Sequence, residues 1–233
     1  MSKLYLIPTT LGENEPAEVL PRSVLNLIPS LRIFVVEELR TARRFLSKTG
    51  HRGHIDELEF HTLNEHTSAQ EVSALTELFS RGDVGLLSEA GLPAVADPGA
   101  LLVAACHRMG IDVVPLAGPS SLMLALMGSG LNGQSFAFRG YLPAKTDERR
   151  AALRSVEKQS ASLHQSQIFI ETPYRNDALF ADMLAGLSDS TRLCIAADLT
   201  LESELIRTKT VAQWKKEKAF SIGKRPCVFI ILA

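Results

Sequence analysis

Three loops of this 233-residue chain combine glycine, proline and small polar residues directly after a strand-like apolar run. They are Pro8 to Gly12, Ser88 to Gly99 and Ala117 to Ser121. Glycine lets a ligand approach the main chain closely, and free amide groups at a helix start can donate hydrogen bonds to it. Ordinary turn and capping chemistry explains any one of these loops. Three of them at one edge of a sheet favour a binding site for a polar ligand.

The second and third loops each lead into an expected helix. Asp97 and Pro98 form a typical helix start, with Asp97 as the N-cap and Pro98 as the first helical residue. Before them, Gly91 would let a ligand approach the backbone. In the third loop, Pro119 at a helix start leaves the amide and hydroxyl of Ser120 free to donate. We therefore expect backbone-lined walls here rather than simple connections.

Common fingerprints do not name the ligand. G-x-G-x-x-G, G-x-x-x-x-G-K-[ST] and G-x-S-x-G do not occur in the sequence. The histidines lack a Cys or Asp cluster at ligand spacing, and the cysteines form no C-x-x-C pair, so no metal is expected. The residues alone indicate a polar cleft in an α/β protein and leave its ligand open.

Composition restricts the class of protein and of partner. The chain is 45% hydrophobic and 22% charged, which is typical of a soluble globular protein. Its formal net charge of −1 means that any nucleic-acid contact must come from a local basic patch. No signal-peptide pattern and no apolar run of membrane-spanning length is present, so a cytoplasmic protein is expected.

Short apolar runs alternate with amphipathic stretches, which predicts a largely parallel α/β sheet. After Gly128 a turn-rich link precedes a second set of elements, so we place a boundary between an N-terminal α/β domain, 1–135, and a smaller C-terminal α/β domain, 136–233. The expected strands are 3–7, 33–37, 84–87, 113–116, 168–171, 193–196, 205–211 and 227–232. The expected helices are 41–48, 69–81, 101–109, 120–127, 175–187 and one starting at 146.

Six segments in series carry a family resemblance. They are Val36–Arg43, Ser88–Gly99, Gly118–Ser120, Gly140–Arg150, Glu171–Arg175 and Leu199–Glu202. With them the chain resembles the tetrapyrrole methylase superfamily, the class III S-adenosylmethionine-dependent methyltransferases. Within it, the likeness is greatest to a branch that methylates a cytidine ribose 2′-hydroxyl in 16S ribosomal RNA.

This resemblance implies a two-domain tetrapyrrole-methylase-like fold, a homodimer, and S-adenosylmethionine in the cleft between the two domains. It also implies ribosomal RNA or the small ribosomal subunit as a partner. The donor contacts that it implies are Pro8, Ser88, Glu89, Ala90, Gly91, Gly118, Pro119, Ser120, Leu142, Glu171, Thr172, Pro173 and Pro226.

Methyl transfer to a hydroxyl requires an aligned donor and acceptor and a group that takes the proton. We expect Glu37, directly after a strand, to be that group, with Arg40 beside it. Glu38 and Glu89 are alternatives. An ion pair between Glu37 and Arg40 or Arg43 is an equally valid interpretation, and it could also hold the carboxylate in place.

Two short basic runs could contact the RNA backbone, although a solvated helix face explains such runs more often. The first is Arg40, Arg43, Arg44 and Lys48, and the second is Lys145, Arg149, Arg150 and Arg154. A polar segment around His66 is a further candidate. We take as substrate contacts Arg43, His66, Lys145 and Arg149.

Two other functions stay open at this point. The family usually reads S-D-A-G-T-P and E-S-P-H-R where this chain has Ser88–Pro93 and Glu171–Arg175. The altered acceptor side is compatible with a small-molecule, tetrapyrrole-type methyltransferase. It is also compatible with a non-catalytic module that binds S-adenosylmethionine and regulates another process.

Overall fold

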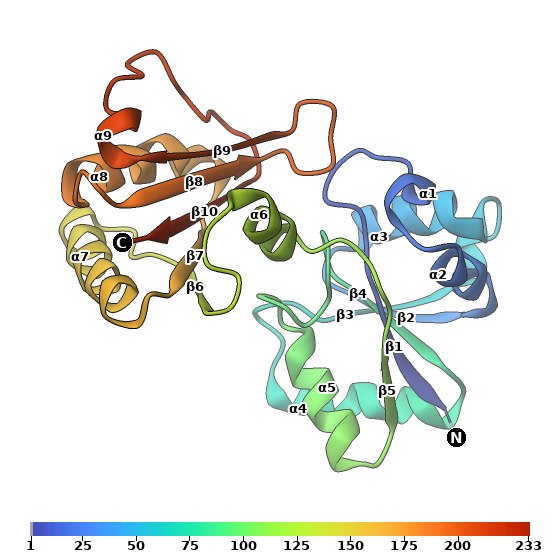
Figure 1. Cartoon of the computed structure of the whole chain (residues 1–233). Helices are drawn as coiled ribbons and strands as arrows, with labels where there is room; N and C mark the ends of the chain where they lie inside the picture. Colours follow the sequence, from blue (N-terminus) through green and yellow to red (C-terminus); the bar gives the residue numbers. More distant parts are fainter. Residues whose placement is uncertain (1) are drawn as a thin grey trace. The chain divides into compact units, whose positions relative to one another are not determined.

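A computed structural model describes residues 2–233 of the chain and divides it into two compact units that meet between Ser120 and Ser121 (Figure 1). The boundary lies earlier than the one expected between residues 135 and 136. The reason is helix α6 (Ser121–Ser129), which packs on the second sheet. Gly128 of this helix lies so close to Ile206 that a side chain there would overlap it. The helix expected at the end of the first domain therefore belongs to the second unit.

The first unit contains a five-stranded sheet in which every neighbouring pair is parallel, in the order β3-β2-β4-β1-β5. Four of these strands match the expected ones within a residue. The fifth, β3, was not foreseen because its short sequence, Glu-Phe-His-Thr, is mostly polar and stands at the sheet edge. The strands are β1 (Lys3–Ile7), β2 (Ile33–Val36), β3 (Glu59–Thr62), β4 (Val84–Leu87) and β5 (Asp112–Pro115).

Helices cover both faces of this sheet, because side chains alternate between the faces along each strand. Ile33 and Val35 of β2 pack in one core with α4 and α5, whereas Phe34 and Val36 pack in another with α2 and α3. The helical segments are α1 (Pro16–Val19), α2 (Arg22–Leu27), η1 (Ile28–Ser30), α3 (Leu39–Leu46), η2 (Ser47–His51), η3 (Ile55–Glu57), α4 (Ala69–Leu75), η4 (Thr76–Ser80) and α5 (Gly99–Arg108).

Local capping fixes where two of these helices begin. The Glu38 side chain accepts a hydrogen bond from the Thr41 amide and caps α3, and Ser68 forms a capping box with Glu71 at α4. The helix expected at 69–81 changes to 3₁₀ geometry after Leu75. Helix α5 begins at Gly99, so the N-cap is Pro98 rather than the expected Asp97.

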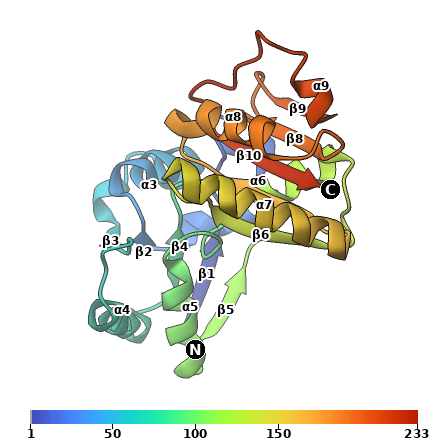
Figure 2. The ribbon, with the colours of Figure 1, turned by 90° about the vertical axis from the view of Figure 1, so that its left-hand side faces the viewer.

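The second unit contains a mixed sheet in the order β6-β7-β10-β8-β9 (Figure 2). Only the pair β6 and β7 is parallel, and the other three pairs are antiparallel. The strands are β6 (Phe136–Tyr141), β7 (Ser166–Ile170), β8 (Arg192–Ala197), β9 (Leu205–Thr210) and β10 (Cys227–Leu232).

Two apolar layers also sandwich this sheet. Alternate residues of β8 and β10, such as Ile195 and Phe229, pack with the long helix α7 and with α8, and Trp214 closes this core. Helix α6 lies against the opposite face, beside Ile206. Within residues 2–233 no helix is long and apolar enough to cross a membrane. The helical segments, besides α6, are α7 (Thr146–Leu163), η5 (Pro173–Arg175), α8 (Asn176–Gly186) and α9 (Val211–Trp214).

Candidate active site

The loops that follow β1, β4 and β5 meet at one edge of the first sheet. The Thr9 amide donates to the Gly91 carbonyl oxygen at 2.9 Å. A Cβ on Gly91, whose φ is +77°, would lie 3.0 Å from a Leu11 methyl group and 3.5 Å from the Pro119 carbonyl oxygen. The three strands are neighbours, in the order β4-β1-β5, which places the loops together. The prediction that these loops share one sheet edge is confirmed.

Glycine is required at two positions of this junction. Gly91 adopts a left-handed backbone conformation that other residues rarely adopt. A Cβ on Gly118 would overlap the ring of Pro8, so the third loop can approach the first only without a side chain. Close backbone packing of this kind builds a wall lined by main-chain groups.

A pocket of about 310 Å³ opens between the loop after β1, the loop after β4 and helix α3. The loops after β1 and β4 lead to helices on opposite faces of the sheet, which is where ligands enter parallel α/β folds. Ser88, Glu89 and Ala90 line the pocket from one side. Thr9 lines it from the other, and its buried hydroxyl has no hydrogen-bond partner among the described residues.

Glu37 stands at the end of β2, half-buried, beside the second loop. Its carboxylate accepts a hydrogen bond from the Glu89 amide at 3.1 Å. Burial raises the pKa of Glu37 above its usual value, the Glu89 amide opposes this, and the nearby carboxylates of Asp97, Glu89 and Glu65 raise the pKa further. A carboxylate with a raised pKa in a ligand-bearing crevice is a suitable proton acceptor.

The residues that follow Glu37 start helix α3 and are exposed to solvent. The Glu38 carboxylate caps the helix, and hydrogen bonds from the amides of Thr41 and Arg40 lower its pKa. No ion pair joins Glu37 to Arg40 or Arg43 within the part of the chain that the structure describes. The carboxylate of Glu37 is held by a backbone amide rather than by a guanidinium.

The basic residues of α3 and of the following segment η2 differ in their surroundings. Arg43 pairs with Asp56 and lies 5.8 Å from the ring centre of Phe60, away from the pocket. Arg44 and Lys48 line the pocket. His66 is 84% exposed in the turn after β3, at the same sheet edge as Glu37.

A second group of candidate residues lies at one edge of the second sheet. Tyr141 pairs with Ile170 in the parallel ladder, and Val228 pairs with Ile170 in the antiparallel one. The register thus places three segments side by side, just beyond the ends of these strands. They are Leu142, Glu171 to Pro173, and Pro226.

Glu171 is the most constrained residue of this second group. Its side chain is fully buried, and its Oε1 accepts hydrogen bonds from the Thr172 amide and from Arg175 Nε, at 2.7 and 2.9 Å. Its Oε2 is buried and has no hydrogen-bond partner among residues 2–233. An unpaired buried carboxylate oxygen is costly unless a ligand supplies a donor. The ammonium, hydroxyl and amine groups of S-adenosylmethionine are donors that suit such an acceptor.

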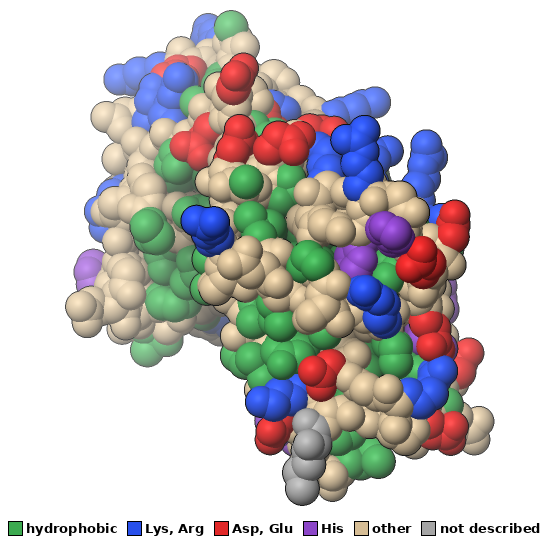
Figure 3. Space-filling model, turned by 90° about the vertical axis from the view of Figure 1, so that its right-hand side faces the viewer, with side chains coloured by type: hydrophobic (Ala, Val, Ile, Leu, Met, Phe, Trp, Pro, Cys, Tyr) green, Lys and Arg blue, Asp and Glu red, His purple; other side chains and the backbone are tan. Residues whose placement is uncertain are grey.

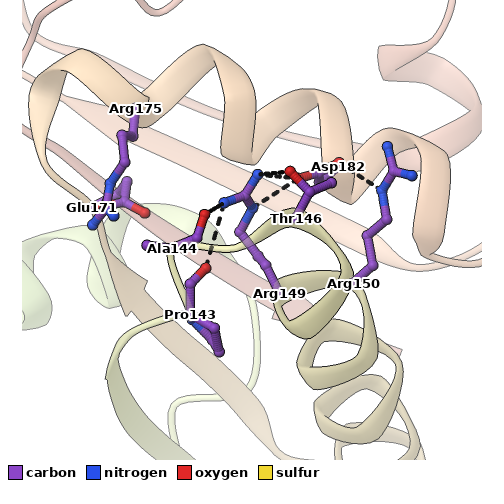
Figure 4. Close-up of polar contacts among 8 residues, drawn as sticks. All are labelled: Pro143, Ala144, Thr146, Arg149, Arg150, Glu171, Arg175 and Asp182. Carbon is purple, nitrogen blue, oxygen red and sulfur yellow. Dashed lines mark hydrogen bonds and ion pairs between the residues drawn. The ribbon is translucent and has the colours of Figure 1, made fainter.

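Arg149 was expected to contact the substrate, but its guanidinium is enclosed by protein (Figure 4). Nε donates to Asp182 at 2.7 Å, and Nη1 donates to the Ala144 carbonyl oxygen, also at 2.7 Å. Arg150 donates to the other oxygen of Asp182. The network fixes the turn that follows Leu142. Lys145 in the same turn is 82% exposed and pairs with its neighbour Glu148.

Asp182 is a structural position that the sequence analysis missed. It lies on α8, and its side chain is 6% exposed. A carboxylate next to the apolar residues Leu179 and Met183 of that helix indicates a buried cation partner, but the spacing does not say which one. The structure also brings Thr9, Arg44 and Lys48 to one pocket, a grouping that needs the sheet order to be known. Within the described residues, no group of three or more His, Cys, Asp or Glu side chains could hold a metal ion.

The family described as Tetrapyrrole (Corrin/Porphyrin) Methylases matches residues 3–214, nearly the whole chain. The chain belongs to this family. As a family member it is a methyltransferase, and the methyl donor of the family is S-adenosylmethionine.

Curated relatives in the family are identical to this chain at about a third of the aligned residues. A protein from Vibrio cholerae is 33% identical over 211 residues, which cover 90% of this chain and 69% of the relative. One from Xylella fastidiosa is 32% identical over 230 residues, covering 98% of this chain and 80% of the relative. Both are named Ribosomal RNA small subunit methyltransferase I.

Solved structures of more distant proteins share the fold. The methyltransferase CobJ superposes with a TM-score of 0.65 at 12% identity, covering 100% of this chain and 94% of CobJ. Uroporphyrin-III C-methyltransferase from Thermus thermophilus, solved with S-adenosylhomocysteine, gives a TM-score of 0.61 at 16% identity. The superposition covers 99% of this chain and 97% of that enzyme. At these identities the likeness establishes the two-unit α/β fold of the family and no more.

Proposed function

We propose that this enzyme methylates a ribose 2′-hydroxyl of small-subunit ribosomal RNA. The observation that carries the proposal is the match to relatives named Ribosomal RNA small subunit methyltransferase I at 32–33% identity over 90–98% of this chain. The solved structures titled uroporphyrin-III C-methyltransferase are only 16–18% identical to it. A tetrapyrrole acceptor is therefore the less supported alternative.

The residues at the first sheet edge suit this reaction. S-adenosylmethionine supplies an electrophilic methyl group, so the protein must align an acceptor hydroxyl and remove its proton. Glu37 would take that proton, since its raised pKa makes the carboxylate a stronger base than an ordinary glutamate. The Glu89 amide fixes the direction of the Glu37 carboxylate. We propose that Arg40, the second residue of α3, contributes positive charge beside the acceptor.

The proposed donor contacts form two sets, one in each unit. In the first unit they lie in the three loops that meet after β1, β4 and β5, where Gly91 and Gly118 permit close backbone packing. In the second unit the unpaired Glu171 Oε2 and the adjacent Thr172 provide an acceptor and a hydroxyl. On the substrate side, Arg43, His66 and Lys145 are exposed or half-exposed cationic or titratable groups. Arg149 would support the turn that carries Leu142.

We also propose that the enzyme acts as a homodimer in the cytoplasm, where ribosomal subunits are found. The edge strand β6 supports a partner subunit, because Phe136, Phe138 and Tyr141 expose apolar side chains on it. Sedimentation equilibrium tests this directly. A monomer at micromolar concentration would contradict the dimer and leave the activity proposal unaffected.

A labelled-methyl transfer assay tests the function. Purified enzyme, labelled S-adenosylmethionine and small ribosomal subunits from cells that lack their own ribose methylase should give label in the 16S RNA. Mass spectrometry of the nucleosides should place the methyl group on a ribose. Label in a tetrapyrrole precursor and none in RNA would contradict the proposal. Donor binding without any transfer would favour a regulatory module.

The variant Glu37→Gln tests the role of the carboxylate. Loss of a general base typically lowers kcat by 10²–10⁴-fold, and this variant should lose about that much with little change in its affinity for S-adenosylmethionine. The control is Glu77→Gln, which removes an exposed carboxylate elsewhere in the first unit and should leave kcat unchanged. An unchanged kcat in Glu37→Gln would exclude Glu37 as the proton acceptor.

A further inference from the structure

Two cations lie together at the pocket of the first unit, Arg44 on α3 and Lys48 on η2, the segment that follows α3 directly. They are four residues apart, a spacing that brings side chains of consecutive helical turns together, and both line the pocket. Basic and acidic side chains are interspersed over the face shown in Figure 3. On this face a polyanion would therefore meet local groups of cations rather than a broad basic surface.

Both cations are at present paired with carboxylates of the loop between β1 and α1. Arg44 lies 3.5 Å from Glu13, and Lys48 lies 2.8 Å from Glu15. All four side chains are at least one third exposed. Solvent-exposed ion pairs contribute little, about 0–1 kcal/mol, so an incoming phosphate can displace these carboxylates. The two glutamates thus occupy the positions that an anionic ligand would take.

The inner part of the pocket has a different character. Thr9 is 4% exposed, and its hydroxyl has no hydrogen-bond partner among the described residues. The apolar side chains of Leu11 and Phe45 also line the pocket. Its volume of about 310 Å³ is at the lower end of the range for small-molecule sites, which suits one nucleotide. An unsatisfied hydroxyl beside apolar walls can recognise a sugar or base edge.

The pocket is also connected to the proposed proton acceptor. Glu89 lines the pocket, and its amide donates to Glu37. A nucleotide in the pocket would therefore contact Glu89, the residue whose amide holds the Glu37 carboxylate. Its phosphodiester would lie with Arg44 and Lys48, the two cations that line the same pocket.

We propose that this pocket binds one nucleotide of the RNA substrate, with its phosphodiester on Arg44 and Lys48 in place of Glu13 and Glu15. This inference rests on the proposed function, since it requires RNA to be the acceptor. It assigns Thr9, Arg44 and Lys48 to the recognition of RNA. It also assigns to Glu13 and Glu15 the role of competing with the RNA backbone for the two cations.

The test compares RNA binding and methyl transfer in matched variants. The double variant Arg44→Ala/Lys48→Ala should raise the KM for small subunits roughly tenfold and reduce the slope of log K against log salt concentration by about 1. Its affinity for S-adenosylmethionine should not change. The control is Arg81→Ala, because the Arg81 side chain is 52% exposed, like the 55% of Arg44, and also pairs with a glutamate. It should change neither quantity.

A second variant separates competition from simple charge loss. Glu13→Gln/Glu15→Gln should strengthen RNA binding and lower the KM, because the phosphate no longer has to displace two carboxylates. Weaker RNA binding in this variant would overturn the proposed competition.

The outcomes also separate this inference from the proposed function. Wild-type enzyme that methylates RNA, together with an Arg44→Ala/Lys48→Ala variant of unchanged KM and salt slope, would overturn the pocket assignment alone. Wild-type enzyme that binds S-adenosylmethionine but neither binds nor methylates RNA would overturn both.

Discussion

The two basic runs of this chain look alike as sequence, but Arg44 of the first and Arg149 of the second have opposite surroundings in the folded protein. In the run on α3, Arg44 is 55% exposed and makes one long ion pair at the mouth of a pocket. In the run on α7, Arg149 is 6% exposed and donates to Asp182 and to backbone carbonyl oxygens. The difference comes from what the rest of the chain places opposite each helix: an exposed loop carboxylate in one case and a buried carboxylate in the other.

This contrast separates a cation that can meet a ligand from one that maintains structure. The guanidinium of Arg149 has a planar array of donors, and the fold satisfies several of them at once. Such a group cannot leave its site without exposing Asp182 as a buried, partly paired charge. Arg44 can exchange its partner at little cost. Exposure and the identity of the partner, rather than residue type, therefore decide which cations are available to a ligand.

The largest effect is expected from Arg149→Ala. Removing one partner of a buried ion pair typically costs 3–5 kcal/mol, and the free energy of unfolding should fall by about that amount because Asp182 would keep only Arg150. Urea denaturation measures this. The control is Arg154→Ala on the exposed face of the same helix, which should change stability by less than about 0.5 kcal/mol. Equal effects in the two variants would show that the network contributes nothing.

Replacing both partners of the buried ion pair tests whether the loss in Arg149→Ala comes from the unpaired charge of Asp182. Arg149→Met/Asp182→Leu removes both buried charges, and exchanging a buried pair for apolar side chains is often neutral or stabilising. We expect this variant to recover most of the stability that Arg149→Ala loses. Denaturation of both variants under the same conditions gives the comparison. A double variant less stable than Arg149→Ala would mean that the turn after Leu142 depends on the charges themselves.

Replacing Arg44, the exposed arginine of the comparison, should change stability very little. Arg44→Ala loses only an exposed ion pair, so its free energy of unfolding should lie within about 0.5 kcal/mol of the wild-type value. Thermal melts of the two proteins test this. A loss above about 2 kcal/mol would place Arg44 with Arg149 as a structural residue, and its effect on RNA binding would then have to be reinterpreted.

The sequence predicts the parts of this molecule that depend on local patterns. Strand positions follow from apolar runs, and β1, β4 and β10 begin and end where they were expected. The three loops of the first unit were found because glycine and proline mark backbone geometry directly. The edge strand β3 lacks such a signal, since an exposed edge does not require an apolar run.

What could not be predicted depends on contacts between distant residues. Arg149 and Asp182 are 33 positions apart, and no local pattern pairs them. The position of α6 was predicted, but its assignment to the second unit required knowing which sheet it covers. The surroundings of Glu37 were predicted in part: its position at a strand end follows from the sequence, while the amide that holds its carboxylate comes from the loop of a neighbouring strand.

Glu37 extends the comparison to a partly buried acid without a cation partner. Asp182 is stabilised by two guanidinium groups, whereas Glu37 has a backbone amide and several nearby carboxylates. Because its folded-state pKa is raised above the usual 4.5, ionised Glu37 destabilises the folded protein. This cost is absent below pH 4.5, where the group is protonated in both states. It grows as the pH rises and is complete above the raised pKa.

Glu37→Gln should therefore increase thermal stability at neutral pH, and the gain should disappear as the pH falls towards 4.5. The amide oxygen of glutamine can still accept from the Glu89 amide, so the change isolates the charge. Melting temperatures of the variant and the wild type, measured across this range, provide the test. A variant that is less stable at neutral pH would show that the ionised carboxylate stabilises this sheet edge. In that case Glu37 would resemble Asp182, whose charge stabilises the fold, and would not be a base that is destabilised in the absence of a substrate hydroxyl.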